Sequence, residues 1–292
     1  MSNRTKNNIK VIYYIFILKI ISIFSPKAAA LKAFQLFTTP YSGKPKREAP
    51  AEFAFATTLH LLFEGKMLYG WQWTPQPEVN NGKKVLIAHG FDSCSYRFAH
   101  YIQPFLQQGF TVIAFDAPAH GLSDGKTTNV LEYRNAIVAI IKKFGPFEVF
   151  MGHSLGGMAL ALAAEKLHEN AKIILIAPAI ETTTAIYAFT KFLKLSTNTK
   201  IAFINHIKSL SHHSIQYFSL SRAIKHIHAP VLWIHDELDK ICPFKDVIPI
   251  MEKKLPNVEF YFTKGLGHSN VYKSKSVKNT IIAFSVNEQH FL

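Results

Sequence analysis

The sequence predicts an α/β fold in which a mainly parallel sheet is covered by helices on both faces and carries a helical lid insertion. Short apolar runs alternate with longer amphipathic segments along most of the chain, as strands and helices do in parallel sheets. A glycine-rich turn at residues 152–156 joins one such apolar run to a helical pattern. With 292 residues, the chain is long enough for one large domain of this class.

The expected elements follow from local composition. Runs rich in valine, isoleucine, leucine and phenylalanine are expected to be strands. These strands cover residues 59–63, 66–73, 85–88, 111–115, 149–151, 173–176, 231–235 and 258–262. Segments of helical periodicity cover residues 51–57, 99–108, 131–143, 157–164 and 277–284. Gly109 ends the second of these helices, because glycine readily takes the conformation that closes a helix.

Residues from about 180 to 228 interrupt the alternation of strands and helices. This stretch is rich in phenylalanine, leucine and isoleucine but has no strong strand pattern. It is expected to be a helical insertion that lies over the strand ends as a lid. The alternative is additional core helix within the domain.

Composition excludes some classes of protein. Hydrophobic residues make up 48% of the chain and aromatic residues 13%, which excludes general disorder. The two cysteines, Cys94 and Cys242, form neither a disulfide framework nor a C-x-x-C metal motif. We therefore expect no metal and no organic cofactor, and a reducing, cytoplasmic location is compatible with the sequence.

The positive charge is concentrated near the N-terminus. Residues 1–50 hold nine lysine and arginine residues and one glutamate, so they carry +8 of the net charge of +14. The only dense basic cluster, residues 44–47, is short. This asymmetry favours an arm near anionic lipid over a nucleic-acid-binding face, and we expect no nucleic acid partner. A solvated basic surface without a partner is the alternative.

Three interpretations compete for residues 9–24, which are apolar apart from Lys10, Lys19 and Ser22. They could be a signal peptide cleaved near the alanines at 28–30, a membrane span, or an interfacial helix. Serine at position 25 followed by Pro26 is a helix-start signal, which assigns the alanines to a helix over residues 27–37. We favour a retained arm, residues 1–50, that packs against the domain at 51–292 or contacts a membrane surface through residues 9–37.

The pattern Gly152-x-Ser154-x-Gly156 follows a strand and precedes a helix, which is the context of a nucleophile elbow. A serine at the apex of such a turn has a strained backbone that lifts its hydroxyl clear of the sheet. The amide of Leu155 lies at the helix N-terminus, where unsatisfied N–H groups favour a developing oxyanion. Ser154 is therefore the predicted nucleophile.

Acyl transfer by serine also needs a base and an acid that orients the base. His268 follows the last predicted strand in a glycine-rich loop and is the predicted base. Asp239 follows the strand at 231–235 and is the predicted acid, in the order Ser, Asp, His. Its rivals are Asp236, Glu237 and Asp246.

The second oxyanion amide is expected in the loop after the strand at 85–88, where Phe91 is the candidate. Two histidines near these positions could be mistaken for the catalytic base. We expect His89 to shape the turn before Phe91, and His153 within the elbow to serve packing rather than chemistry.

These residues resemble the α/β-hydrolase superfamily over roughly residue 59 to the C-terminus. The resemblance rests on His89-Gly90-Phe91, on Asp116-Ala117-Pro118-Ala119-His120-Gly121-Leu122-Ser123, on Gly152-His153-Ser154-Leu155-Gly156-Gly157, on Asp239 before Pro243, and on Gly267-His268. It implies catalytic roles for Ser154, Asp239 and His268, with Phe91 and Leu155 as oxyanion amides. The chain departs from the family where Ala119 replaces a frequent glycine, and where Asp236 replaces the glycine of a frequent His-Gly pair. The second departure keeps Asp236 a rival for the acid.

The expected function is that of a serine hydrolase acting on a small-molecule ester or related acyl compound. The short His-Gly-Phe sequence resembles the branch of the superfamily that acts on simple esters. Serine at the elbow argues against the haloalkane and epoxide chemistries, which usually use aspartate there. Thioesterase and amidase activities use the same triad and stay open, and the alternative from another class is a non-catalytic binding or membrane-associated module.

Overall fold

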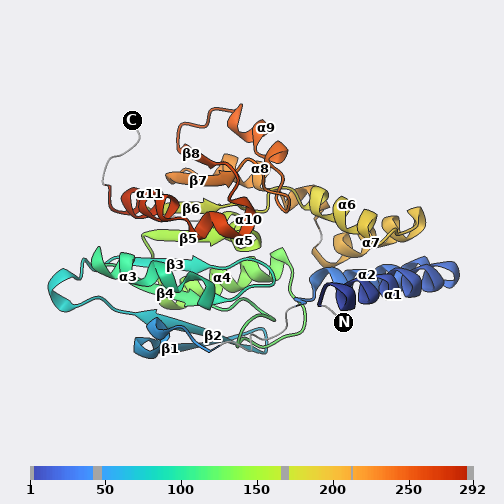
Figure 1. Ribbon diagram of the computed structural model, residues 1–292, viewed down its shortest axis with the longest axis horizontal. Helices are drawn as coiled ribbons and strands as arrows, with labels where there is room; N and C mark the ends of the chain where they lie inside the picture. Colours follow the sequence, from blue (N-terminus) through green and yellow to red (C-terminus); the bar gives the residue numbers. More distant parts are fainter. Residues whose placement is uncertain (1–2, 42–47, 166–170, 212, 288–292) are drawn as a thin grey trace. The chain divides into compact units, whose positions relative to one another are not determined.

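The computed structural model describes residues 3–41, 48–165, 171–211 and 213–287 (Figure 1). The basic cluster at 44–47 lies outside the described residues. The chain divides into two compact units. The larger unit comprises Pro40–Ile180 and Leu220–Leu292, and the smaller comprises Met1–Thr39 and Glu181–Ser219.

The larger unit contains an eight-stranded sheet in the order β1-β2-β4-β3-β5-β6-β7-β8. Its strands are β1 (Thr57–Phe63), β2 (Lys66–Trp73), β3 (Lys84–Ala88), β4 (Thr111–Phe115), β5 (Val149–His153), β6 (Lys172–Ile176), β7 (Val231–Asp236) and β8 (Val258–Thr263). The β1–β2 and β2–β4 pairs are antiparallel, and the remaining neighbours are parallel. The predicted mainly parallel sheet is confirmed.

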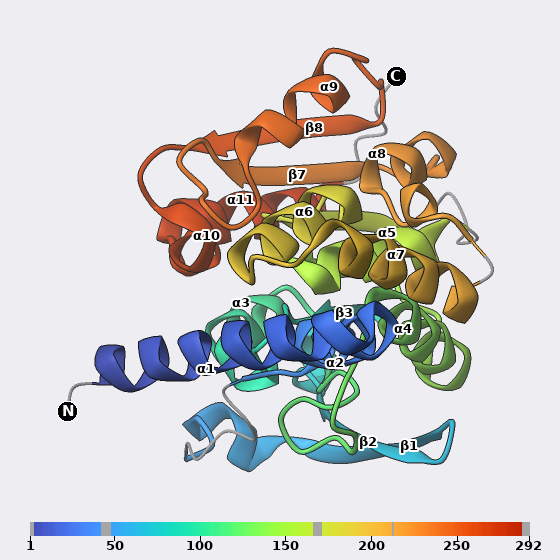
Figure 2. The ribbon, with the colours of Figure 1, turned by 90° about the vertical axis from the view of Figure 1, so that its right-hand side faces the viewer.

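Helices cover both faces of this sheet (Figure 2). One face packs against α3 (Ala99–Gln107) and α11 (Lys275–Val286), and the other against α4 (Val130–Phe144) and α5 (Leu155–Ala164). The shorter helices α8 (Leu220–Ala223), α9 (Ile248–Met251) and α10 (Gly267–Asn270) lie in the second half of the unit. The helix expected at 51–57 is wrong in its last two residues, because a 3-10 turn spans Ala51–Phe55 and β1 already begins at Thr57.

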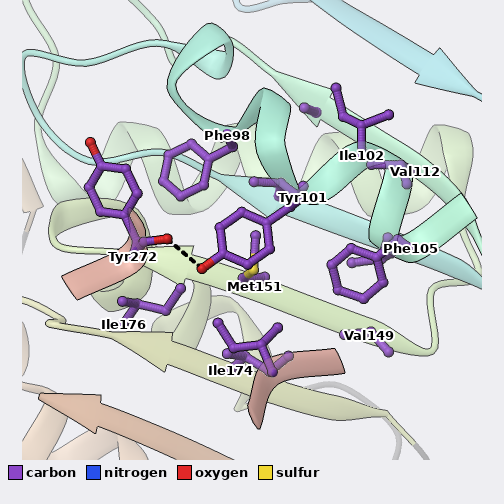
Figure 3. Packing of buried hydrophobic residues seen from close by; sticks show 14 of the residues in the cluster. Phe98, Tyr101, Ile102, Phe105, Val112, Val149, Met151, Ile174, Ile176 and Tyr272 are labelled. Carbon is purple, nitrogen blue, oxygen red and sulfur yellow. Dashed lines mark hydrogen bonds between the residues drawn. The ribbon is translucent and has the colours of Figure 1, made fainter. Parts of the chain in front are cut away.

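The core beneath α3 positions the C-terminal part of the site (Figure 3). Tyr101 is fully buried, and its hydroxyl donates a hydrogen bond to the carbonyl oxygen of Tyr272 at 2.7 Å. Phe98 stacks on the ring of Tyr272 with centroids 5.0 Å apart. These contacts fix the segment directly after α10, the helix that contains His268, against the sheet.

The smaller unit is helical and consists of two pairs of helices. Its helices are α1 (Asn3–Phe24), α2 (Pro26–Thr38), α6 (Thr182–Phe192) and α7 (Thr197–Ser211). The side chain of Ser25 accepts a hydrogen bond from the amide of Ala28 at 3.1 Å, and Pro26 begins α2, as the helix-start signal predicts. Among the residues that can be described, no helix combines the length and apolarity needed to cross a membrane.

Residues distant in sequence form the core of the smaller unit. The rings of Phe34 and Phe37 from α2 contact that of Phe203 from α7, with centroids 5.9 and 5.8 Å apart. Ser22 of α1 hydrogen-bonds to Ser196 and Thr199, at the start of α7, at 2.9 and 2.8 Å. The N-terminal helices therefore pack with the inserted helices as one body. The boundaries proposed for arm and lid stay predictions.

Candidate active site

The turn between β5 and α5 places Ser154 at the carboxyl edge of the sheet. Its backbone has φ 53° and ψ −123°, a strained conformation for a residue with a side chain. A Cβ on Gly156 would lie 2.3 Å from the carbonyl oxygen of His89, and one on Gly152 would lie 2.7 Å from Cα of Gly157. Only glycine fits at both positions, so the two glycines permit the close approach of strand, turn and helix.

The structure brings Ser154, His268 and Asp239 into one chain of hydrogen bonds. Nε2 of His268 lies 3.0 Å from Oγ of Ser154, and Nδ1 lies 2.7 Å from Oδ2 of Asp239. Because a carboxylate only accepts, Nδ1 carries the proton and donates to Asp239, which leaves Nε2 as the acceptor of the serine proton. This arrangement equips Nε2 to act as a base toward the serine hydroxyl.

The carboxylate of Asp239 is buried but well satisfied. Its Oδ1 accepts hydrogen bonds from the amides of Ile241 and Cys242 at 2.7 and 2.9 Å. Burial alone would raise the pKa of Asp239, but the hydrogen bond and charge interaction with His268, together with these amides, hold the pKa below its ordinary value. Asp239 therefore stays ionised and holds the imidazole of His268 in one tautomer.

Asp236, the rival acid, makes a different set of contacts. Its carboxylate accepts from the hydroxyl of Thr263 at 2.8 Å, from the amides of Leu238, Leu266 and Gly265 at 3.0, 2.9 and 3.2 Å. Burial by itself would raise the pKa of Asp236. The hydrogen bonds from Thr263 and from backbone amides outweigh this effect, so the pKa lies below its ordinary value. Asp236 thus ties the loop after β7 to the loop before His268. Sequence reasoning kept Asp236 open as an acid and could not assign this anchoring contact.

The two other rival carboxylates lie elsewhere. Glu237 pairs with Lys264 at 3.4 Å, and its side chain is 40% exposed. Asp246 lies in a 3-10 turn, Phe244–Asp246. Among the described residues, Asp239 is therefore the carboxylate that hydrogen-bonds to His268.

The loop after β3 approaches the nucleophile directly. A Cβ on Gly90 would lie 2.9 Å from Cβ of Ser154, so the backbone leading to Phe91 passes beside the serine. Leu155 begins α5, where the first amides have no partner within the helix. Gly90, which precedes Phe91, and Leu155 thus both lie beside Ser154, and the amides of Phe91 and Leu155 stay the predicted oxyanion donors.

Comparison with known proteins agrees with this fold. A family model described as serine aminopeptidase, S33, matches residues 80–223. The solved structure of an esterase from Pyrococcus furiosus has a TM-score of 0.63 at 20% identity, covering 85% of this chain and 96% of the esterase. This chain has the α/β-hydrolase fold. The expected α/β fold class and the resemblance are confirmed, and the lid stays a prediction.

Curated relatives match this chain over shorter stretches. A monoacylglycerol lipase of Mycolicibacterium smegmatis is 30% identical over 117 residues, which cover 37% of this chain and 41% of the lipase. An uncharacterized hydrolase of Bacillus subtilis is 31% identical over 103 residues, covering 33% of this chain and 37% of the relative. The chain therefore spans about two fifths of the length of these relatives, which are named for hydrolysis.

One departure from the superfamily pattern, Ala119, has a visible consequence in the backbone. Ala119 takes the left-handed conformation with φ 66°, which glycine would adopt without strain. Its amide donates to the carbonyl of Asp124 at 2.8 Å, so the loop closes with alanine in place. Cys242, to which the sequence analysis gave no role, is buried, and burial raises the pKa of its thiol.

The histidines set aside in the sequence analysis are buried and structural. Nδ1 of His89 donates to the carbonyl of Gly90 at 2.7 Å, and Nε2 accepts from the amide of Ala117 at 2.9 Å. Nε2 of His153 donates to the carbonyl of His268 at 3.1 Å, and the two rings lie 4.8 Å apart. His153 therefore supports the backbone of the residue that contacts Ser154. Within the described residues, no group of three or more His, Cys, Asp or Glu side chains could hold a metal ion.

Because His153 is buried, we expect the folded state to become less stable as the pH falls. Burial, followed by the nearby charge of His268, lowers the pKa of His153 to about 3, whereas an unfolded histidine has a pKa of about 6.5. Between pH 6.5 and 3 the unfolded chain binds a proton that the folded chain does not. The free energy of unfolding therefore falls as pH falls, by up to about 1.4 kcal/mol per pH unit for this residue. Urea unfolding at intervals between pH 7 and pH 5 measures this slope.

The variant His153→Gln keeps an N–H donor and removes the titrating group. We expect the free energy of unfolding of this variant to depend less steeply on pH than that of the unaltered chain. The difference in slope should correspond to the uptake of about one proton on unfolding. Burial lowers the pKa values of His89 and His120 to about 4. These two residues therefore contribute equally to the pH dependence of stability in both proteins. Identical slopes in the two proteins would contradict the prediction.

Proposed function

We propose that this chain is a serine hydrolase that cleaves a carboxylic ester or related acyl compound through an acyl-enzyme. The observation that carries the proposal is the continuous hydrogen bonding from Asp239 through His268 to Ser154, at 2.7 and 3.0 Å. The names of its relatives, which include a lipase and an esterase, support the same class of reaction.

The proposed reaction begins when Oγ of Ser154 attacks the acyl carbon while Nε2 of His268 takes the serine proton. The carbonyl oxygen becomes an oxyanion, which the backbone amides of Phe91 and Leu155 stabilise. Collapse of this intermediate breaks the acyl–oxygen bond, and His268 returns the proton to the leaving alcohol. Water then attacks the acyl-enzyme with His268 as the base, which releases the carboxylic acid and regenerates Ser154. Asp239 holds the imidazole in place and stabilises its protonated form throughout.

Two further features belong to the proposal. The chain enters the helical insertion soon after β6, and the amide of Ala179 donates to the carbonyl of Ser154 at 3.0 Å. We propose that residues 180–228 act as a lid, whose phenylalanine and leucine side chains favour an apolar acyl group or alcohol. We also propose that residues 9–37 contact a membrane surface, since α1 leaves several large apolar side chains exposed.

A fluorophosphonate probe tests the proposed nucleophile. Such a probe should form an adduct at Ser154, which peptide mass spectrometry would locate, and prior denaturation should abolish labelling because the triad then disperses. A panel of p-nitrophenyl esters of graded chain length, with a matched thioester and amide, would then rank the acyl substrates. Absence of an adduct at Ser154 in the folded protein would favour the alternative, a non-catalytic module built on the same fold.

A further inference from the structure

The outer face of α1 is apolar and exposed. Six large side chains, between 39% and 84% exposed, recur at spacings of three and four residues along one side of the helix. They are Ile12, Tyr13, Phe16, Ile20, Ile23 and Phe24, and are named the α1 stripe below. The core of the smaller unit does not account for this stripe, because Leu18, which is 1% exposed, points to the opposite face.

The same unit carries an extreme charge. Met1–Thr39 and Glu181–Ser219 contain ten lysine and arginine residues and a single acidic residue, Glu181. These two segments therefore hold +9 of the net charge of +14. Lys19 is exposed within the span of the α1 stripe, and Lys27 is exposed just beyond it.

The inserted helices add to this pattern. Tyr187 and Phe192 of α6 are 64% and 59% exposed, and Ile201 of α7 is 54% exposed. Lys191 lies over the ring of Tyr187 at 5.6 Å, so cationic and aromatic groups adjoin on α6 as well. Ser22 of α1 hydrogen-bonds to the start of α7. A surface that binds α1 is therefore also connected to the inserted helices.

We propose that the smaller unit is a peripheral membrane-binding unit that recognises anionic lipid surfaces, with the α1 stripe entering the interface. A helix with an apolar face and lysines at its borders lies in the plane of a bilayer, where the lysine stems extend to the headgroups. The scarcity of acidic groups complements anionic headgroups and opposes pairing with a second copy of the same cationic unit. The proposal goes beyond contact through residues 9–37, because it makes the arm and the insertion one lipid-binding body.

Lipid binding by the smaller unit extends the proposed hydrolase function, because it indicates where the substrate is located. If the acyl hydrolase activity stands, the lipid-bound unit directs it toward acyl esters that reside in or partition into membranes. Binding itself does not depend on the chemistry at Ser154, so the two proposals can be tested separately.

Vesicle co-sedimentation of the full chain tests the binding. We expect at least tenfold tighter binding to vesicles of phosphatidylcholine with 30% phosphatidylglycerol than to phosphatidylcholine alone, and a marked loss in high salt. The double variant Phe16→Ser with Phe24→Ser should bind the anionic vesicles at least tenfold more weakly. The matched control is Phe55→Ser with Leu62→Ser, which removes side chains of 84% and 69% exposure from the larger unit and should bind as the unaltered chain does.

Several results would overturn the proposal. These are equal binding to neutral and anionic vesicles, unchanged binding of the α1 double variant, or equal losses in the two double variants. Self-association that the α1 variant abolishes, in the absence of vesicle binding, would assign the stripe to contact between copies and also reject the proposal. The variant Ser154→Ala should bind vesicles normally, so failure of the hydrolase activity and failure of lipid binding are distinguishable.

Discussion

Replacement of Ser154 by alanine is expected to lower kcat for ester hydrolysis by about four to six orders of magnitude. The variant loses the oxygen that forms the acyl-enzyme, and His268 is left with no proton to accept from a nucleophile. Residual hydrolysis over the uncatalysed rate is expected, because the proposed oxyanion amides of Phe91 and Leu155 would still stabilise an oxyanion formed by attack of water. Steady-state kinetics on the best ester of the panel measure the loss.

The loss should fall on kcat while the fold is retained. Ser154 donates its proton within a site that His268 and Asp239 already hold together, so removal of one hydroxyl should leave the unfolding midpoint little changed. Ser276→Ala, on the exposed face of α11, is the matched control and should keep full activity. A Ser154→Ala protein that is folded and still hydrolyses the ester at a rate within tenfold of the unaltered chain would exclude Ser154 as the nucleophile.

Most of the larger unit could be predicted because its signals are local. All eight strands coincide with apolar runs bounded by polar or turn residues. The parallel arrangement of β3 to β8 follows from the helical segments between them. The 3-10 turn at Ala51–Phe55 was not predicted as such, since a short run of alanine and phenylalanine does not distinguish one helical turn from the start of an edge strand.

The candidate site was predictable for a different reason. Ser154, Asp239 and His268 each follow a strand of one parallel sheet, and the carboxyl ends of such strands meet at one edge. The structure places them within hydrogen-bond distance, and their catalytic roles stay a prediction until activity is measured. Sequence favoured Asp239 as the acid but kept Asp236 as a rival, because the conformation of the loop after β7 decides which carboxylate turns toward His268.

The packing of the smaller unit was beyond sequence reasoning. The apolar periodicity of residues 27–37 predicted a helix, and that of residues 180–228 predicted helices, but periodicity does not say which apolar faces pair. The ring of Phe37 contacts that of Phe203, which lies 166 positions further along the chain. Only the three-dimensional structure shows that the basic arm and the insertion belong to one unit. The lipid-binding proposal depends on this packing.

Replacement of Gly156 by alanine is expected to destabilise the fold by about 3 kcal/mol or more. The new Cβ would lie 2.3 Å from the carbonyl oxygen of His89 and 2.6 Å from that of Ala88. Both are backbone atoms at the end of β3, so no side chain can rotate away and the strand itself must move. Urea unfolding followed by tryptophan fluorescence gives the change in free energy directly.

The neighbouring Gly157 provides the matched control within the same helix. A Cβ there would lie 3.1 Å from the carbonyl oxygen of Gly152 and from Cβ of Pro178, contacts that shifts of a few tenths of an ångström relieve. Alanine also favours a helix over glycine by about 1 kcal/mol, so Gly157→Ala should change stability by no more than about 1 kcal/mol. Since β3 leads to Phe91, Gly156→Ala should also lower kcat in whatever fraction folds, because displacement of that strand moves the proposed oxyanion amide away from Ser154. Equal stability of the two variants would mean that β3 yields easily, and that the close approach of strand and elbow does not hold the site in place.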